Sequence, residues 1–285
     1  MSTVNARGAD LPHVIDASEP RAKAIYARLH SHRFILVSVV AVACVILAWQ
    51  LASSLGWANA TLLPSPLEVI ATAVDLAQRG YRQTALWQHW LVSSSRALVA
   101  FIAAIGVGVP LGLLMGRNLY VNAAFNPFVQ FLRPLPKIAL VPLVILWFGI
   151  GEGGKFFLIF ISTLLSIVVS SAAAVQGVSQ ARMRAAQTLG ASRRQQFIHV
   201  ILPNALPEVM TGIRLSVGIG WTSLIAAEMV AANSGLGWMV INASAYLRTD
   251  VVMLGIFLLG VTGVVFDWVI TALQRRLAPW AGRDV

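Results

Sequence analysis

The sequence predicts an all-α, polytopic membrane protein with about six transmembrane helices. Hydrophobic residues make up 58% of the 285 positions, charged residues make up 11%, and the mean hydropathy is +0.76. So few charges cannot cover the surface of a water-soluble domain. The apolar residues also gather in runs that are long enough to cross a bilayer as helices.

Positive charges are concentrated in every second segment that joins or flanks these apolar runs. The net charge of +10 would suit nucleic acid, but the charges follow a membrane topology, so we exclude a nucleic-acid partner. By the positive-inside rule, both termini and the central loop are cytoplasmic. The inner segments hold Arg7, Arg21, Lys23, Arg28, Arg33, Arg117, Arg182, Arg184, Arg193, Arg194, Arg275, Arg276 and Arg283, whereas the alternate loops hold only Arg79, Arg82, Lys155 and Arg248.

The N-terminal region divides into a polar tail and a first span. We expect a cytoplasmic tail over residues 1–33 and a span over 34–54. Ala58-Asn59-Ala60 matches a signal-peptide cleavage pattern, but the long tail and the spanning length of the apolar run predict an uncleaved anchor. The single cysteine, Cys44, lies in this span, which excludes a disulfide or a thiolate metal site.

A short helix is expected between the first two spans. Residues 67–76 carry too many charges to cross the membrane. Pro66 suits a helix start and Ser65 suits its cap, so we predict an amphipathic helix on the outer face.

The second span, residues 90–115, contains a stripe of glycines. Gly108, Gly112 and Gly116 are four residues apart, which lets another helix approach closely. Pro110 predicts a bend, and Arg96 is expected to reach the headgroups or a cavity near the outer end.

The third span, residues 121–150, is interrupted by Arg133-Pro134-Leu135-Pro136-Lys137. Two prolines free backbone carbonyls, which are tolerated at membrane depth only against protein or water. Each charge there costs a few kcal/mol unless it faces such a cavity. The segment therefore predicts a pathway lining. The alternative is that a tilted helix lets both charges reach an interface.

The last three spans are expected over residues 156–175, 205–230 and 251–273. The preceding residues 149–155 fit the phosphate-binding pattern G-x4-G-K, but Phe156 replaces the magnesium-binding hydroxyl and no strand precedes them, so we interpret them as a turn. Glu228 is expected near the outer end of its span, and Asp267 near the cytoplasmic end.

The central loop, residues 179–203, predicts two short amphipathic helices. Ser179 suits the first cap and Gly190 suits the first end, while Ser192 and Gln195 form a capping box for the second. Such short helices are marginal alone, so they must dock on other protein or on the bilayer surface. The expected apolar faces are Met183, Ala186 and Leu189 in the first helix, and Phe197, Val200 and Ile201 in the second.

This loop resembles the EAA coupling loop of binding-protein-dependent ABC importer permeases. The family pattern is Glu-Ala-Ala, three residues, Gly, nine residues, Ile, one residue and Leu-Pro. Arg184 replaces the family Glu, which affects any charge pair with the partner ATPase. The alternative is an ordinary basic cytoplasmic loop. The pattern falls on Arg184, Ala185, Ala186, Gly190, Val200, Leu202 and Pro203.

Separated motifs resemble one branch of this family, which handles taurine, alkanesulfonates and nitrate. They are Leu63-Pro64-Ser65-Pro66, Arg133-Pro134-Leu135-Pro136, Trp147-Phe148-Gly149-Ile150-Gly151-Glu152, Ala226-Ala227-Glu228-Met229 and Ser234-Gly235-Leu236-Gly237. Residues 184–192 and 272–280 are similar to the taurine permeases in particular, in which Arg also stands at the first position of the EAA pattern.

The resemblance implies the permease subunit of an ATP-driven importer in a bacterial inner membrane. It implies a second permease copy, a cytoplasmic ATPase dimer that holds ATP and magnesium, and a periplasmic binding protein. This chain would hold no cofactor or metal, would form a permease domain over residues 34–279, and would end in a cytoplasmic tail over 280–285. We assign Arg184, Ala185, Ala186, Gly190, Leu202 and Pro203 to ATPase coupling, and Arg133, Lys137, Arg214, Trp221 and Glu228 to the pathway. Within the coupling loop, we expect Gly190 to form the turn and Pro203 to end the second helix.

Other classes of function fit the sequence less well. The sequence shows no nucleophile, base and orienter, and no metal-spaced cluster, so we do not expect an enzyme. A secondary transporter should show paired interrupted helices in two related halves, and only one interrupted helix is evident. A membrane scaffold would have no reason to carry a broken, charged span.

Overall fold

The computed structural model describes residues 20–56, 59 and 61–281, and it describes side chains from residue 36 onward. Most of the predicted tail and the residues Ala58 and Ala60 of the cleavage-like motif lie outside this part of the chain. The chain forms two units, residues 1–58 and 59–285. No strand occurs among the described residues, so the all-α prediction is confirmed for them.

The first unit contributes one helix, α1 (Pro20–Ser54). Its segment Leu36–Ser54 is apolar and long enough to cross a membrane. The helix starts before the predicted span because residues 21–33 are rich in good helix formers such as Ala, Arg and Lys. Residues 20–33 of the predicted tail are therefore helical and continuous with the span.

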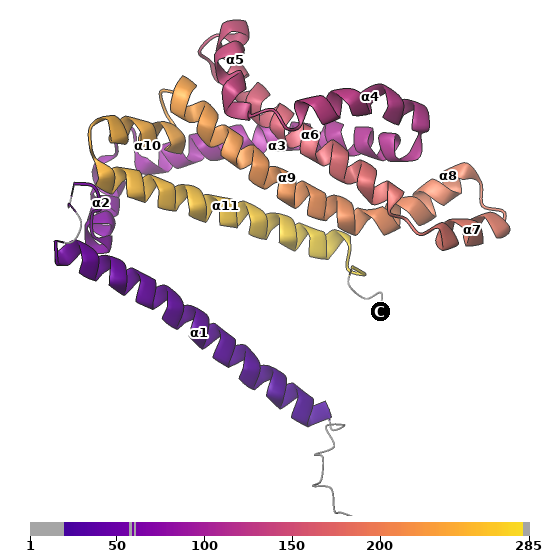
Figure 1. The fold of residues 1–285 in the computed structure, drawn as a ribbon, viewed down its shortest axis with the longest axis horizontal. Helices are drawn as coiled ribbons and strands as arrows, with labels where there is room; N and C mark the ends of the chain where they lie inside the picture. Colours follow the sequence, from indigo (N-terminus) through magenta and orange to yellow (C-terminus); the bar gives the residue numbers. More distant parts are fainter. Residues whose placement is uncertain (1–19, 57–58, 60, 282–285) are drawn as a thin grey trace, which may run out of the picture. The chain divides into compact units, whose positions relative to one another are not determined.

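The second unit is a bundle in which α3, α6, α9 and α11 run side by side (Figure 1). The described residues contain five helices long enough to span a membrane, or six if a bent pair counts as one span. The elements are α2 (Pro66–Arg79), α3 (Leu86–Arg117), α4 (Leu119–Leu132), η1 (Lys137–Leu140), α5 (Val141–Phe148), α6 (Glu152–Gln176), α7 (Gln180–Thr188), α8 (Arg193–Gln195), η2 (Gln196–Ile201), α9 (Leu202–Ala231), α10 (Leu236–Ala245) and α11 (Thr249–Leu277).

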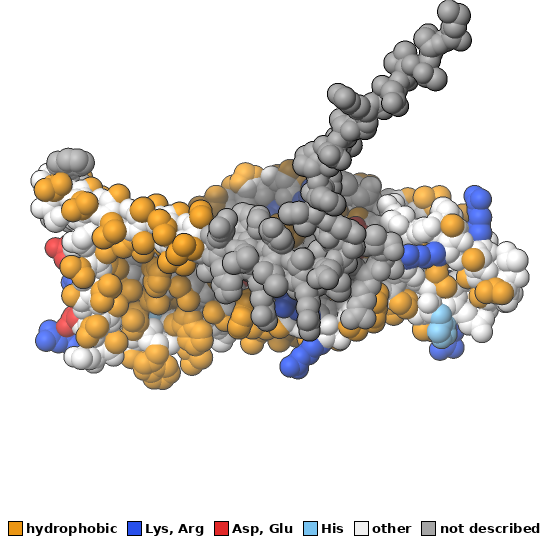
Figure 2. Space-filling view, turned by 90° about the horizontal axis from the view of Figure 1, so that it is seen from below, with side chains coloured by type: hydrophobic (Ala, Val, Ile, Leu, Met, Phe, Trp, Pro, Cys, Tyr) orange, Lys and Arg blue, Asp and Glu red, His pale blue; other side chains and the backbone are white. Residues whose placement is uncertain are grey.

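The two ends of this bundle differ. Helices α2 and α10 lie at one end and α7 and α8 lie at the other (Figure 1). Figure 2 shows basic side chains at the end that carries α7 and α8, and many hydrophobic side chains along the visible surface. We refer below to the end that carries α10 as the α10 end.

Helix α2 begins as predicted. The Ser65 side chain accepts a hydrogen bond from the backbone amide of Glu68, and the Glu68 carboxylate accepts one from the amide of Ser65. Pro66 occupies the first turn, where its missing N–H costs nothing. The short helix between the first two spans is confirmed.

The third span is broken, as predicted. Helix α4 and the η1–α5 segment are bent by 92° relative to each other at residues 133–136. The two prolines cause this break, because they remove amide donors and disfavour the helical conformation of the residues before them.

The glycine stripe of α3 packs against α6. A Cβ atom added to Gly112 would lie 2.6 Å from the Val168 carbonyl oxygen and 2.6 Å from the Ser171 Cβ. Gly116 is similarly crowded by α6, and a Cβ atom at Gly108 would lie 2.9 Å from a side-chain carbon of Ile167. The close approach predicted from the spacing is confirmed, and Pro110 lies inside this helix without ending it.

Gly112→Ala should destabilise the bundle, because the added methyl group would meet a backbone carbonyl that cannot move alone. We expect a loss of about 1–3 kcal/mol of unfolding free energy, as for other overpacked sites. Gly106→Ala, on the same helix, is the control, since nothing lies within 4 Å of its added Cβ. Thermal unfolding in detergent measures both; equal melting temperatures would contradict the packing.

Candidate functional site

The loop between α6 and α9 forms one candidate site. Gly190 ends the α7 segment with a φ of 76°, a left-handed conformation that favours glycine. The Ser192 hydroxyl accepts from the Gln195 amide at 3.3 Å, and the Gln195 side chain accepts from the Ser192 amide at 2.8 Å. Both predicted signals are confirmed. Ser179 stands at the cap position of α7, but its side chain accepts no capping bond, so that prediction was wrong.

The second helix of the loop does not end at Pro203. Residues Arg193–Ala231 form a single helical segment that continues into the span. Residues Gln196–Ile201 adopt a π-helix, in which the Leu202 amide donates to the Phe197 carbonyl five residues earlier. This wider turn relieves the clash that Pro203 would otherwise make with the preceding turn. The prediction that Pro203 terminates this helix was therefore wrong.

The predicted coupling residues divide into exposed and buried groups. Arg184, Ala185 and Gly190 are exposed, Leu202 and Pro203 are half-buried, and Ala186 is buried. The expected apolar face was partly wrong. Met183 packs against the core, but Leu189 lies at the tip of α7 with 87% of its surface exposed.

Several contacts hold the loop on the bundle. Arg117 at the end of α3 donates to the Arg193 carbonyl at 3.1 Å, and its guanidinium lies 4.8 Å from the centre of the Phe197 ring. Trp280 donates to the Pro203 carbonyl at 3.2 Å. The loop is therefore held by the end of α3 and by the residues that follow α11.

A second candidate site lies at the α10 end, around the fully buried carboxylate of Glu228. The Ser93 hydroxyl lies 2.8 Å from both carboxylate oxygens, and Arg96 Nη1 donates to Oε1 at 2.7 Å. The Gly237 amide donates to Oε2 at 2.9 Å. A buried carboxylate needs such a set of donors and a positive partner.

Arg96 extends this site to α6. Its Nε and Nη2 atoms donate to the Glu152 carboxylate at 2.6 and 2.7 Å, a bidentate pair. Its Nη1 also donates to the Ser234 carbonyl at 2.7 Å. Lys155, which is buried, donates to Glu152 at 2.9 Å. We call Arg96, Glu152, Lys155 and Glu228 the charged cluster; its two positive and two negative groups balance.

The turn before α10 wraps closely around the charged cluster. A Cβ atom at Gly235, whose φ is +119°, would meet the Glu228 carboxylate, and one at Gly237 would lie 2.9 Å from the Glu228 Cβ. The Gly235 amide donates to His89 Nδ1 at 3.1 Å, so the proton of this imidazole faces the Tyr81 carbonyl from Nε2. Glycines at 235 and 237 thus allow the backbone to approach the carboxylate.

In the broken span, the Lys137 ammonium group binds backbone carbonyls of the break itself. Lys137 Nζ donates to the carbonyls of Leu132, Arg133 and Leu135 at 2.8, 3.1 and 3.1 Å. It therefore supplies hydrogen-bond donors to backbone carbonyls at the end of α4 and within the break. The Arg133 side chain is exposed.

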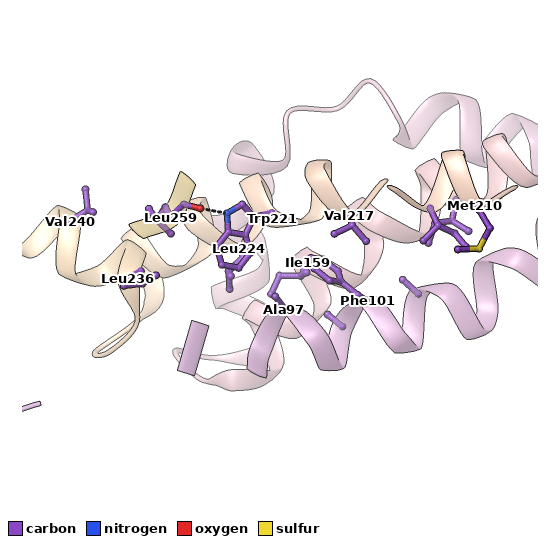
Figure 3. Close-up of a cluster of buried hydrophobic side chains, with 14 of the residues drawn as sticks. Ala97, Phe101, Ile159, Met210, Val217, Trp221, Leu224, Leu236, Val240 and Leu259 are labelled. Atoms are coloured by element: carbon purple, nitrogen blue, oxygen red, sulfur yellow. Dashed lines mark hydrogen bonds between the residues drawn. The ribbon is translucent and has the colours of Figure 1, made fainter. Parts of the chain in front are cut away.

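The remaining pathway candidates lie along α9 without joining each other. Arg214 forms an ion pair with Asp267 of α11, and its Nη2 donates to Oδ2 at 2.7 Å. Trp221 is 6% exposed, and its Nε1 donates to the Leu259 carbonyl at 3.1 Å (Figure 3). Its ring also packs edge to face on Phe266. Trp221 thus joins α9 to α11 within the core of the single chain.

The sequence contained a signal for the charged cluster that we did not use. Arg96, Glu152, Lys155 and Glu228 all fell near the predicted outer ends of spans two, four and five. Charges at equal depth in neighbouring apolar helices are expected to pair, because each is costly alone. Glu152 and Lys155, predicted to lie in a turn, are in the first turn of α6.

Comparison with known proteins gives a consistent result. The family described as "Binding-protein-dependent transport system inner membrane component" matches residues 108–279. The taurine transport system permease protein TauC of Escherichia coli is 39% identical over 90% of this chain and 98% of its own length. The putative aliphatic sulfonates transport permease protein SsuC of E. coli is 40% identical over 87% and 90%.

More distant relatives agree. The nitrate import permease protein NrtB of Synechocystis is 29% identical over 84% of this chain and 88% of its own. A chain of the inward-facing MetNI methionine ABC transporter covers 72% of this chain with a TM-score of 0.58 at 17% identity, and 98% of that chain is matched. The MetNI likeness supports the fold.

Glu228→Ala should leave Arg96 buried without one of its carboxylates and should lower the unfolding free energy by about 3–5 kcal/mol. Asp267→Ala is the matched control, because the side chains of its ion pair with Arg214 are 44% and 43% exposed and the pair should contribute much less. Thermal unfolding in detergent compares them. Similar losses from both variants would contradict the role of the buried pair.

Proposed function

The chain belongs to the family of binding-protein-dependent transport system inner membrane components, and on this premise we propose that it carries taurine from the periplasm to the cytoplasm. Membership makes it a multi-pass permease subunit of an ABC importer. The similarity to TauC, which extends over nearly the whole of both chains, carries the choice of substrate.

Two related substrates are the alternatives. SsuC is as similar as TauC over a slightly shorter alignment, which favours an alkanesulfonate as the second candidate. The nitrate permease is less similar, so nitrate is the third. Growth of a deletion strain complemented with this chain and its partner proteins, on taurine, ethanesulfonate or nitrate as the sole sulfur or nitrogen source, distinguishes the three. Growth restored only on ethanesulfonate, or only on nitrate, would contradict the proposal.

The working assembly would contain two copies of this chain, an ATPase dimer and a periplasmic binding protein. Both termini and the loop 179–203 would face the cytoplasm, where the ATPase would bind ATP and magnesium. This loop contains no acidic residue, and Arg184, Arg193 and Arg194 are exposed on it. Such a surface favours a partner with an acidic groove. The small residues Ala185 and Gly190 would allow the ATPase to approach the loop closely. The transport pathway would run between the two copies of this chain.

The continuous helix supplies a mechanical link for this assembly. Residues Arg193–Ala231 run from the loop to the charged cluster in one helical segment, a length of roughly 58 Å at 1.5 Å per residue. Displacement of the loop would therefore shift the α10 end directly. ATP and the loaded binding protein would each favour one of two arrangements, which gives alternating access.

A transporter that works alone is the competing function. It would neither copurify with an ATPase nor lose uptake when ATP is depleted. The basic loop fixed by Arg117 and Trp280 favours the dependent mechanism, because an isolated transporter has no use for a rigid surface outside the membrane. Copurification and uptake after ATP depletion separate the two.

Ala185→Trp should abolish most taurine uptake, at least tenfold, while the protein stays folded, because the residue is exposed and the bulky ring would block docking. Ala77→Trp is the control, since Ala77 is an exposed helical alanine at the opposite end. Uptake by proteoliposomes that contain the complete transporter gives the measurement. Undiminished uptake by Ala185→Trp would exclude the loop as the ATPase contact.

A further inference from the structure

A small cavity lies against the charged cluster at the α10 end. Its volume is about 230 Å³, and it is lined by Ser95, Arg96, Val99, Glu152 and Phe156. A water molecule in the liquid occupies about 30 Å³, so the cavity has room for a molecule of a few heavy atoms. Its walls combine two charged side chains with the apolar surfaces of Val99 and Phe156.

This cavity belongs to an aqueous or protein-covered face. The Glu152 side chain is 65% exposed, although it lies in the first turn of the spanning helix α6 and pairs with the nearly buried Arg96. An ionised carboxylate turned toward lipid is strongly disfavoured. The side of α3 and α6 that carries Glu152 therefore faces water or another subunit.

Arg96 has hydrogen-bond donors whose present acceptor, the Glu152 carboxylate, a ligand can replace. A guanidinium has five N–H donors, and four of them bind the carboxylates of Glu152 and Glu228 and the Ser234 carbonyl. Among the described residues, the fifth has no partner. The contact with Glu228 is buried, whereas the two bonds to Glu152 lie on the open side. An oxyanion that enters the cavity can take the place of the Glu152 carboxylate on the Nε and Nη2 edge.

Replacement of the Glu152 carboxylate on Arg96 suits a molecule that carries one negative and one positive group. A sulfonate group presents oxygens to Arg96, and the displaced, exposed Glu152 carboxylate can then accept an ammonium group. We infer that Arg96 and Glu152 form a transient binding subsite for a zwitterionic aminosulfonate along the pathway, an inference that rests on the proposed function. The charged cluster is neutral, so a molecule without net charge enters without leaving an unpaired charge. A plain alkanesulfonate brings no such cation, so Glu152 would keep Lys155 as its single positive partner.

Substitution of Glu152 tests this discrimination. Glu152→Gln keeps an oxygen for Arg96 but removes the charge that binds the ammonium group. We expect taurine uptake by the complete transporter in proteoliposomes to fall about fivefold relative to ethanesulfonate uptake, the effect of one partly exposed ion pair. Glu152→Asp keeps the charge and should retain taurine uptake within about twofold.

The control is Asp75→Asn, which removes another ion-paired, exposed carboxylate that lies on α2 outside the cavity. It should change the uptake of neither substrate. The inference is overturned if Glu152→Gln lowers the uptake of both substrates equally, if it changes neither, or if Glu152→Asp is as impaired with taurine as Glu152→Gln.

These outcomes differ from failure of the proposed function. If the unmodified transporter takes up taurine and Glu152→Gln shows no selective loss, the function stands and the subsite is wrong. If the unmodified transporter takes up no taurine, the proposed substrate is wrong and the subsite is excluded with it.

Discussion

A carboxylate inside an apolar bundle is stable only when donors and a positive charge surround it, and Glu228 meets this condition through Ser93, Arg96 and the Gly237 amide. The Arg96 guanidinium in turn reaches Glu152 and the Ser234 carbonyl. One network therefore joins α3, α6, α9 and the turn before α10. The glycine positions in that turn, the start of α6 and the register of α3 against α9 all depend on it.

The same helix that carries Glu228 begins in the basic loop at the other end. A π-turn lets the helix pass Pro203 without a break, and Arg117 and Trp280 fix the loop on the bundle. A push on the loop therefore has a stiff path to the charged cluster. Under the proposed function, this arrangement would let an ATPase that binds the loop act on the far end of the permease.

Predictions from the sequence were confirmed for features that depend on residues close together in the chain. The glycine stripe of α3, the Ser65 and Ser192 caps and the proline break needed only spacing and backbone chemistry. Features that depend on the fold as a whole could not be predicted. The pairing of Arg96 with Glu228 joins residues 132 positions apart, the burial of Trp221 depends on α11, and the continuation through Pro203 depends on the π-turn. Leu189 shared the expected apolar periodicity, but the turn at Gly190 places it at the exposed tip.

The central claim is that Arg96 and Glu228 act as one buried unit. A double-mutant cycle of Arg96→Met, Glu228→Met and the double variant, measured as the unfolding free energy in detergent, tests it most directly. If the two charges stabilise the bundle only together, the double variant should be more stable than Glu228→Met alone, because no unpaired charge remains at that position. Strictly additive losses from the two substitutions would contradict the account.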